Sequence, residues 1–216
     1  MIVLSHRGYW KEPAEKNTEA AFVRSFALGF GTETDFRDRD GKLVISHDMP
    51  RGGEMTAETF FSLYVQHGRG LPLALNIKAD GLQSELQALV AQYEIPSSDY
   101  FVFDMAVPDA LGYLRREMPA FTRKSELEPE PAFADKAAGV WIDGFFGDWF
   151  GPRELETLLR QFRRVCVVSP ELHGRPHRPL WDCLAGSAII DQPGLMICTD
   201  RPEEARAVYG GTGVGG

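Results

Sequence analysis

The sequence predicts an α/β fold of the (β/α)₈ TIM-barrel class, compact and with a small β-hairpin after the second strand. Apolar runs of strand length alternate with amphipathic helical windows along the chain, a pattern typical of parallel β/α units. Eight such apolar runs can be counted, which is the number of strands in a barrel of this class. Several connections between them are short, so we expect a compact barrel.

The eight predicted strands are short apolar runs bounded by polar or turn residues. They cover residues 2–5, 32–36, 73–77, 100–103, 120–122, 139–142, 165–168 and 195–198. A further strand, 43–46, is joined to the second by a turn that contains Asp40-Gly41, a dipeptide typical of tight hairpins. This hairpin is expected to bring His47 back over the mouth of the barrel.

Helical windows separate the strands, and several have a proline in the first turn, where its missing N–H costs nothing. The predicted helices cover residues 18–28, 57–66, 82–93, 108–117, 152–162, 179–185 and 202–208. Between residues 48 and 71 there is room for only one short loop and one helix.

The 216 residues, of which 44% are hydrophobic, are enough for one substantial core. We expect a single domain over residues 1–209 and a flexible glycine-rich tail over 210–216, which lacks the lysine of a phosphate-binding loop. A formal net charge of −8 argues against nucleic acid or an anionic membrane as a partner, since both favour a basic surface.

The three cysteines, Cys166, Cys183 and Cys198, lie among apolar neighbours and lack the spacing of metal ligands. Buried free thiols in a reducing compartment are therefore expected. The first strand begins at residue 2, which leaves no room for an export signal, and no apolar run is long enough to span a membrane. A cytoplasmic location is the expectation.

Ionisable residues gather where the first strands end. Glu33 and Asp35 are two residues apart on one strand, so their side chains project from the same face. Two adjacent carboxylates raise each other's pKa unless a cation lies between them. A bound Mg²⁺ or Ca²⁺ would resolve that conflict. The alternative is that the two acids bind nearby amides or pair with Arg37.

His6 and His47 follow two other strands at the same expected edge, and each can carry a proton near neutral pH. One could take a proton from the attacking oxygen while the other protonates the leaving oxygen. Arg7 and Lys78 would bind the phosphate oxygens, where charge grows in the transition state. Lys78 could at the same time pair with Glu33 or Asp35.

Together these motifs resemble the glycerophosphodiester phosphodiesterase family of the phospholipase C-like phosphodiesterases. The resemblance implies a TIM barrel, a bound divalent metal, His6 as the base and His47 as the acid. From its position in the sequence, Asn17 is expected to cap the first helix; the resemblance places it at the rim of the active site as well. The matching stretches are His6-Arg7-Gly8, Asn17-Thr18, 31–35, 40–48, 75–78, 103–104 and 199–202.

Asn76 departs from this family pattern, which has a glutamate there as a third metal ligand. An amide oxygen can still coordinate Mg²⁺ or Ca²⁺, but it brings no charge. Asp104, Asp143 or Glu171, each after a predicted strand, could complete the metal shell. The family's longer insertion after residue 48 is also absent, which weakens the expectation of a glycerol-specific pocket.

Two later segments admit both a functional and a structural interpretation. Residues 169–178, rich in histidine and arginine, could bind a second anionic group of the substrate or form a solvated basic loop. Five aromatic residues could form an apolar wall for a sugar or lipid fragment, or belong to the core. They are Trp141, Phe145, Phe146, Trp149 and Phe150.

The function predicted from these residues is metal-dependent hydrolysis of a small soluble phosphodiester, which makes the chain a phosphoric diester hydrolase. Attack could come from water, or from a substrate hydroxyl through a cyclic intermediate. Two alternatives remain: a phosphate-ester binding or regulatory protein, and a metal-free lyase that releases a cyclic phosphate. The sequence predicts no oligomeric state.

Overall fold

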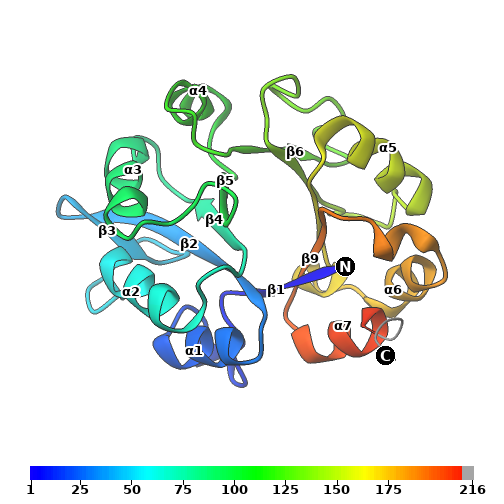
Figure 1. Cartoon of the computed structure of the whole chain (residues 1–216), viewed down its shortest axis with the longest axis horizontal. Helices are drawn as coiled ribbons and strands as arrows, with labels where there is room; N and C mark the ends of the chain where they lie inside the picture. Colours follow the sequence, from blue (N-terminus) through cyan, green and yellow to red (C-terminus); the bar gives the residue numbers. More distant parts are fainter. Residues whose placement is uncertain (211–216) are drawn as a thin grey trace. The chain divides into compact units, whose positions relative to one another are not determined.

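The computed structural model describes residues 1–210, so residues 211–216 of the predicted tail lie outside the described residues. The nine strands and seven α helices within residues 1–210 follow the predicted alternation (Figure 1). Eight strands are parallel and interleaved with helices, and β3 (Lys42–Ile45) pairs with β2 (Gly31–Arg39) off the main path of the sheet. The predicted (β/α)₈ barrel fold is confirmed.

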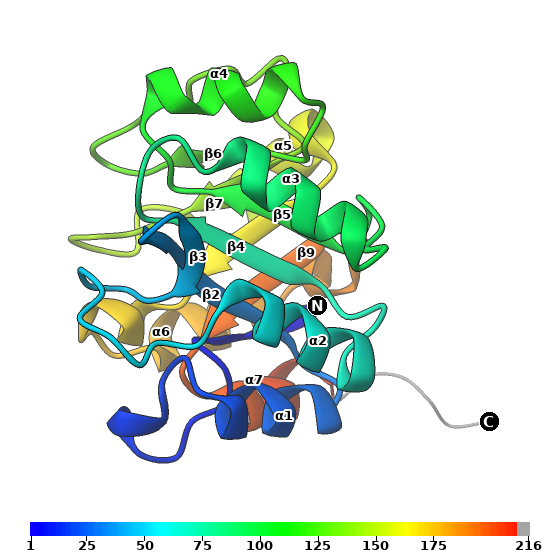
Figure 2. The same ribbon diagram turned by 90° about the vertical axis from the view of Figure 1, so that its left-hand side faces the viewer.

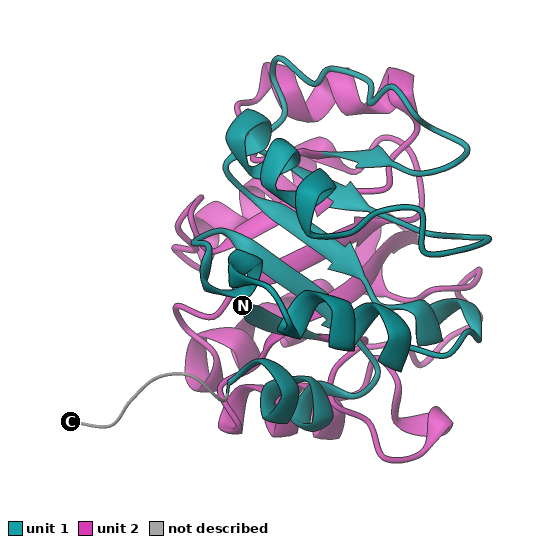
Figure 3. Cartoon of the chain, turned by 90° about the vertical axis from the view of Figure 1, so that its right-hand side faces the viewer, with its two compact units in different colours: residues 1–4, 122–216 teal, residues 5–121 magenta. Residues whose placement is uncertain are grey.

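The chain divides into two compact units, which Figure 3 shows in different colours. Unit 1 comprises Met1–Leu4 and, among the described residues, 122–210, and unit 2 comprises Ser5–Phe121. Strand β1 (Ile2–His6) and strand β6 (Phe121–Lys124) each contribute residues to both units. The expectation of a single domain over residues 1–209 stays a prediction.

In unit 2, β4 lies between β2 and β5 in the sheet. Thr32 to Phe36 of β2 align in parallel with Leu73 to Ile77 of β4, which places Asp35 directly beside Asn76. The elements of this unit are β2 (Gly31–Arg39), β3 (Lys42–Ile45), β4 (Leu73–Ile77), β5 (Tyr100–Phe103), α1 (Glu19–Ala27), α2 (Ala57–His67), α3 (Gln83–Gln92), α4 (Val107–Arg115) and the 3₁₀ turn η1 (Pro13–Glu15).

The hydrophobic core of unit 2 lies between these strands and their helices. Helix α2 packs between α1 and α3, and Figure 2 shows the three side by side. Phe36 of β2 meets Phe60 and Phe61 of α2, with ring centroids 6.0 and 5.7 Å apart. Because side chains alternate along a strand, burying Phe36 under α2 turns Glu33 and Asp35 to the opposite face of β2.

The predicted hairpin is present. Asp40 and Gly41 connect β2 to β3 with φ angles of +51° and +74°, the left-handed pair that a two-residue turn between twisted strands requires. Immediately after β3, the Ser46 N–H donates to the Asp35 carbonyl oxygen at 3.0 Å. The chain therefore returns to the acid-bearing part of β2 just before His47.

In unit 1, the strands follow the order β9, β8, β7 and β6. Each of its three α helices has a proline in the first turn, as expected from the sequence. The elements are β7 (Gly139–Ile142), β8 (Val165–Val168), β9 (Leu195–Thr199), α5 (Pro152–Phe162), α6 (Arg178–Ala185), α7 (Pro202–Tyr209) and the 3₁₀ turns η2 (Pro170–His173) and η3 (Ala188–Asp191).

Two local expectations are wrong. Cys166 and Cys198 are buried as expected, but Cys183 is exposed, because it lies on the outer face of α6 between the buried Trp181 and Leu184. Asn17 does not cap α1: the N-cap residue is Thr18, and the Asn17 side chain is bonded elsewhere.

Candidate active site

Glu33 and Asp35 form a buried acid pair on β2, with 1% and 0% of their surfaces exposed. Burial first, and then the negative charge of Asp35, raise the pKa of Glu33 to about 7, against the opposing effect of His6, Arg7 and Lys78. The expected mutual effect of the two carboxyls is therefore present, although desolvation is the larger cause.

Arg7 joins the two acids. Its main-chain N–H lies 3.2 Å from Glu33 Oε2 and 2.9 Å from the Glu33 carbonyl oxygen, and its Nε lies 3.0 Å from Asp35 Oδ2. Arg7 adopts a φ of +59°, a conformation that few residues other than glycine adopt. That turn of the backbone lets Arg7 donate to Glu33 from its main chain while its side chain forms an ion pair with Asp35.

Gly8 makes this turn possible. It has a φ of +78°, and a Cβ at this position would lie 2.7 Å from Ala21 Cβ of α1. Its N–H donates to Thr32 Oγ1 at 3.1 Å. Only glycine combines the left-handed conformation with so close an approach of a helix.

Asn17 and Lys78 complete the surroundings of Asp35. Asn17 Nδ2 donates to Asp35 Oδ2 at 2.9 Å, and Asn17 Oδ1 accepts from Thr34 Oγ1 at 3.0 Å. Lys78 Nζ lies 3.7 Å from Asp35 Oδ1 and 3.0 Å from Asp104 Oδ2. Asp35 is thus contacted by two cations, and the predicted structural role of Lys78 is observed.

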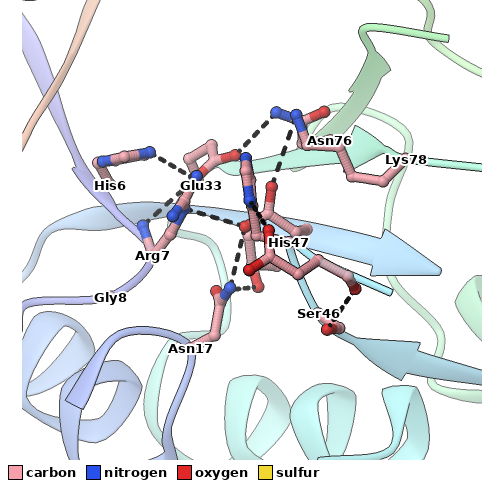
Figure 4. A network of polar contacts seen from close by, with 12 residues as sticks. His6, Arg7, Gly8, Asn17, Glu33, Ser46, His47, Asn76 and Lys78 are labelled. Atoms are coloured by element: carbon pink, nitrogen blue, oxygen red, sulfur yellow. Dashed lines mark hydrogen bonds and ion pairs between the residues drawn. The ribbon is translucent and has the colours of Figure 1, made fainter. Parts of the chain in front are cut away.

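Asn76 faces the acid pair from β4. Its Nδ2 donates to Glu33 Oε1 at 3.1 Å, as Figure 4 shows together with the contacts of His6 and Arg7 with Glu33. Asn76 Oδ1 and Asp35 Oδ1 are both buried without a hydrogen-bond donor. Buried acceptor oxygens on neighbouring strands are atoms that a cation would satisfy.

The two predicted histidines differ in their surroundings. His6 Nε2 lies 3.9 Å from Glu33 Oε2, and 15% of its side chain is exposed. His47 has 46% of its side chain exposed, and its Nδ1 lies 2.8 Å from Asp48 Oδ1. Arg37, the alternative partner of the acids, instead donates to the His47 carbonyl oxygen at 3.0 Å.

A hollow of about 700 Å³ adjoins these residues, between the loop after β1 and the loop after β3, and both Arg7 and His47 line it. The structure therefore brings His47 and Arg7 to one cavity, while His6 lies beside the acid pair. Within residues 1–210, no three His, Cys, Asp or Glu side chains form a metal-binding group.

The other candidate acids already have partners. Asp104 contacts Lys78 in unit 2. In unit 1, Asp143 Oδ1 lies 2.6 Å from His173 Nε2, and Glu171 accepts from Thr199 Oγ1 and from the Asp200 N–H. Their predicted part in a metal shell stays a prediction.

The cations of residues 169–178 are paired within unit 1: Arg175 lies 2.7 Å from Asp148, His177 lies 3.0 Å from Glu204, and Arg178 lies 2.6 Å from Asp182. These contacts favour the structural interpretation of that loop.

The five aromatic residues near β7 do not form one exposed wall. Trp141 and Phe150 are buried in the core of unit 1, whereas Phe146 is 74% exposed. Phe145 lies against His173, with ring centroids 4.9 Å apart.

Sequence reasoning missed one contact of the site. Trp10 Nε1 donates to the His6 carbonyl oxygen at 3.2 Å, and so holds the backbone of a candidate catalytic residue. A tryptophan four residues after a histidine is the only local signal for this contact.

Neither a protein-family model nor a curated protein sequence matches the chain. Solved structures do match over nearly the whole chain. A protein from Galdieria sulphuraria, provisionally assigned as a glycerophosphodiester phosphodiesterase, is 19% identical with a TM-score of 0.72, and the match covers 97% of each chain. A glycerophosphodiester phosphodiesterase from Agrobacterium tumefaciens is 16% identical, with a TM-score of 0.68 over 96% of this chain and 99% of that chain.

A Ca²⁺-dependent phosphatidylinositol-specific phospholipase C from Streptomyces antibioticus also matches, at 11% identity and a TM-score of 0.60 over 96% of this chain and 95% of that chain. At such identities the similarity is one of fold. The chain therefore shares its (β/α)₈ barrel fold with solved glycerophosphodiester phosphodiesterases, the family that its His6-Arg7-Gly8 motif resembles.

Proposed function

We propose that this protein is a phosphodiesterase that hydrolyses a small soluble phosphodiester. The observation that carries the proposal is the buried acid pair Glu33 and Asp35, contacted by Arg7 and Lys78 and flanked by His6. This arrangement occurs in a fold shared with glycerophosphodiester phosphodiesterases. Both cations are partly exposed, so they can contact a bound phosphate.

The proposed role of Arg7 and Lys78 is to bind the non-bridging phosphate oxygens. Asp35 holds the Arg7 guanidinium in place at 3.0 Å, and Asp35 with Asp104 holds the Lys78 ammonium. Two fixed cations stabilise the extra negative charge of a pentacoordinate phosphorus better than they stabilise the ground state. The carboxylates thereby serve as positioning groups for the cations.

The proposed roles of His6 and His47 are those of base and acid. A proton taken up by His6 would be stabilised by the carboxylate of Glu33, 3.9 Å away. His47 Nδ1 is already paired with Asp48, which leaves its Nε2 to give a proton to the leaving oxygen. In this assignment the partly buried imidazole of His6 begins the reaction and the exposed imidazole of His47 protonates the alcohol that leaves.

Glu33, Asp35 and Asn76 would hold a divalent metal, Mg²⁺ or Ca²⁺, in this proposal. The two buried oxygens without donors, Asp35 Oδ1 and Asn76 Oδ1, support that choice. Such an ion would act as a Lewis acid on the phosphate. Because Asn76 brings no charge, we expect weaker binding than with three carboxylates.

Hydrolysis of bis(p-nitrophenyl) phosphate by the purified chain tests the proposal. We expect turnover that EDTA removes and that Mg²⁺ or Ca²⁺ restores, with losses of about a hundredfold or more in His6→Ala and His47→Ala. The same ions should raise the melting temperature of the wild type but not of Asp35→Asn, a readout independent of turnover.

The outcomes separate the alternatives. The metal-free lyase needs a second substrate, a diester with a hydroxyl next to the phosphate, because bis(p-nitrophenyl) phosphate has no hydroxyl that can attack phosphorus. Release of the other alcohol and a cyclic phosphate from that diester in the presence of EDTA would favour the lyase, for which the contacts of Arg7 and Lys78 with the acids are the supporting observation. Absence of any diester turnover, unchanged by the histidine substitutions, would refute the proposal and favour a phosphate-ester binding protein.

A further inference from the structure

The hollow beside Arg7 and His47 has no assigned role. It lies within unit 2, between the loop that follows β1 and the loop that follows β3. Since Arg7 and His47 both line it, any diester bound to Arg7 would place one of its two alcohol substituents in this hollow. The lining of the hollow should therefore decide which substituent is accepted.

The size of the hollow exceeds what a three-carbon alcohol needs. Its volume of about 700 Å³ lies within the range of pockets that hold molecules of drug size. Pro13, Ile45 and Met55 contribute apolar surface, while the remaining lining is largely polar. A substituent larger than glycerol and rich in polar groups fits this composition.

Most charged groups that line the hollow already have a partner. Arg7 is paired with Asp35, and Asp48 with His47. Glu54 accepts from the N–H groups of Arg51 and Gly52, which hold its pKa down at about 2. Glu19 is exposed in the first turn of α1, where water screens its charge.

Lys16 is different. It is half-buried, and its ammonium lies 4.4 Å from the centroid of the Trp10 ring. Among the residues that the structure describes, no carboxylate forms an ion pair with it. A cation held on an aromatic face keeps most of its charge available to a ligand, because the ring carries no formal charge.

The surroundings of Lys16 fix its position. Trp10 is bound through Nε1 to the His6 carbonyl oxygen, and Glu15 in the same loop accepts from the Lys11 N–H at 2.8 Å and pairs with Arg24 at 2.8 Å. The loop that carries Lys16 is thus tied both to the end of β1 and to α1. An ion pair formed by Lys16 would cost little ordering of the loop.

We propose that this hollow binds a diester substituent that carries its own anionic group, a carboxylate or a phosphomonoester, and that Lys16 forms the ion pair with it. The inference rests on the proposed phosphodiesterase function and adds a specificity-determining residue to it. The hollow should prefer an anionic substituent because Lys16 is a half-buried cation without an acidic partner among the described residues. Glu19, the carboxylate of the lining that could repel an anion, is exposed to solvent.

Two matched substrates test this inference. One is a methyl phosphodiester of a nitrophenol that carries a carboxylate, so that the alcohol released beside His47 bears the anion, and the other is the methyl ester of that carboxylate. In Lys16→Ala we expect kcat/KM for the carboxylate substrate to fall about five- to tenfold, mainly through KM, while the value for the methyl ester changes less than about twofold. Lys16→Arg should retain most of the preference.

Lys11→Ala is the matched control, because Lys11 also lies on an aromatic ring of this loop but does not line the hollow. It should leave both substrates unaffected, and added salt should reduce the wild-type preference for the carboxylate. Equal losses on both substrates in Lys16→Ala would overturn the inference while leaving the phosphodiesterase proposal intact. Absence of turnover of either diester by the wild type would overturn both.

Discussion

The substitution Glu33→Gln should raise the free energy of unfolding at alkaline pH, whereas most substitutions of a buried polar residue lower it. Glu33 is buried, and its pKa rises from an ordinary value of 4.5 to about 7. Between these two values the folded state binds more protons than the unfolded state, so the free energy of unfolding falls as the pH rises. The contribution of Glu33 to stability is fully present below pH 4.5, and it is lost as the pH rises through 7.

The size of the effect follows from the same two values. A rise from 4.5 to about 7 corresponds to a loss of about 3 kcal/mol of stability above pH 8, at about 1.4 kcal/mol for each tenfold change in proton affinity. Glutamine keeps an acceptor for the Arg7 N–H or for Asn76 Nδ2 and carries no charge. We therefore expect the variant to exceed the wild type by about 2 kcal/mol at pH 8 and to be close to it at pH 5.

Urea unfolding in EDTA-containing buffers between pH 5 and pH 8 measures this difference. Glu19→Gln, which removes an exposed carboxyl from α1, serves as the control and should follow the wild-type curve. Parallel pH profiles for the wild type and Glu33→Gln would refute the reasoning, since they would mean that Glu33 is charged at no cost in the folded protein.

Three further outcomes are expected. Gly8→Ala should lower the free energy of unfolding by about 3 kcal/mol, because the added Cβ would lie 2.7 Å from Ala21 Cβ. Gly29 has a similar φ, but a Cβ there would have no atom within 4 Å. Gly29→Ala should therefore lower the free energy of unfolding by only about 1 kcal/mol in the same urea titration. Cys183 alone should react rapidly with a thiol reagent in the native protein, and all three cysteines should react in denaturant. Rapid reaction of all three cysteines in the native protein would contradict this expectation. Asn76→Asp should add a charged ligand beside Asp35 and strengthen Mg²⁺ or Ca²⁺ binding about tenfold, measured by the shift in melting temperature; an unchanged shift would argue against a metal at this position.

Much of the architecture could be predicted because it depends on patterns local in the sequence. Strands β4, β5, β7 and β8 begin and end at the predicted residues, since each is a short apolar run between polar or turn residues. The hairpin after β2 could be predicted because Asp40-Gly41 suits the two left-handed conformations of its turn. Strand alternation placed Glu33 and Asp35 on the same face.

The contacts that decide the details of the site are not local. Asn17 could have capped α1, but the amide reaches Asp35 on β2 instead, and a sequence does not reveal which of two acceptors lies nearer after folding. The exposure of Cys183 depends on which face of α6 meets the core. The pairing of Asp104 with Lys78 likewise depends on the packing of β5 beside β4.

The hydrogen bond from the Ser46 N–H to the Asp35 carbonyl oxygen has a consequence for engineering. This bond anchors the chain just before His47. The distance between the His47 imidazole and the acid pair Glu33 and Asp35 is therefore set by β2 and its hairpin. As long as Asp48 is kept as the partner of His47, we expect that the segment from Met49 onward can be lengthened, shortened or exchanged without moving either group. Grafting loops at this junction offers a route to new substrate preferences while the proposed catalytic groups stay unchanged.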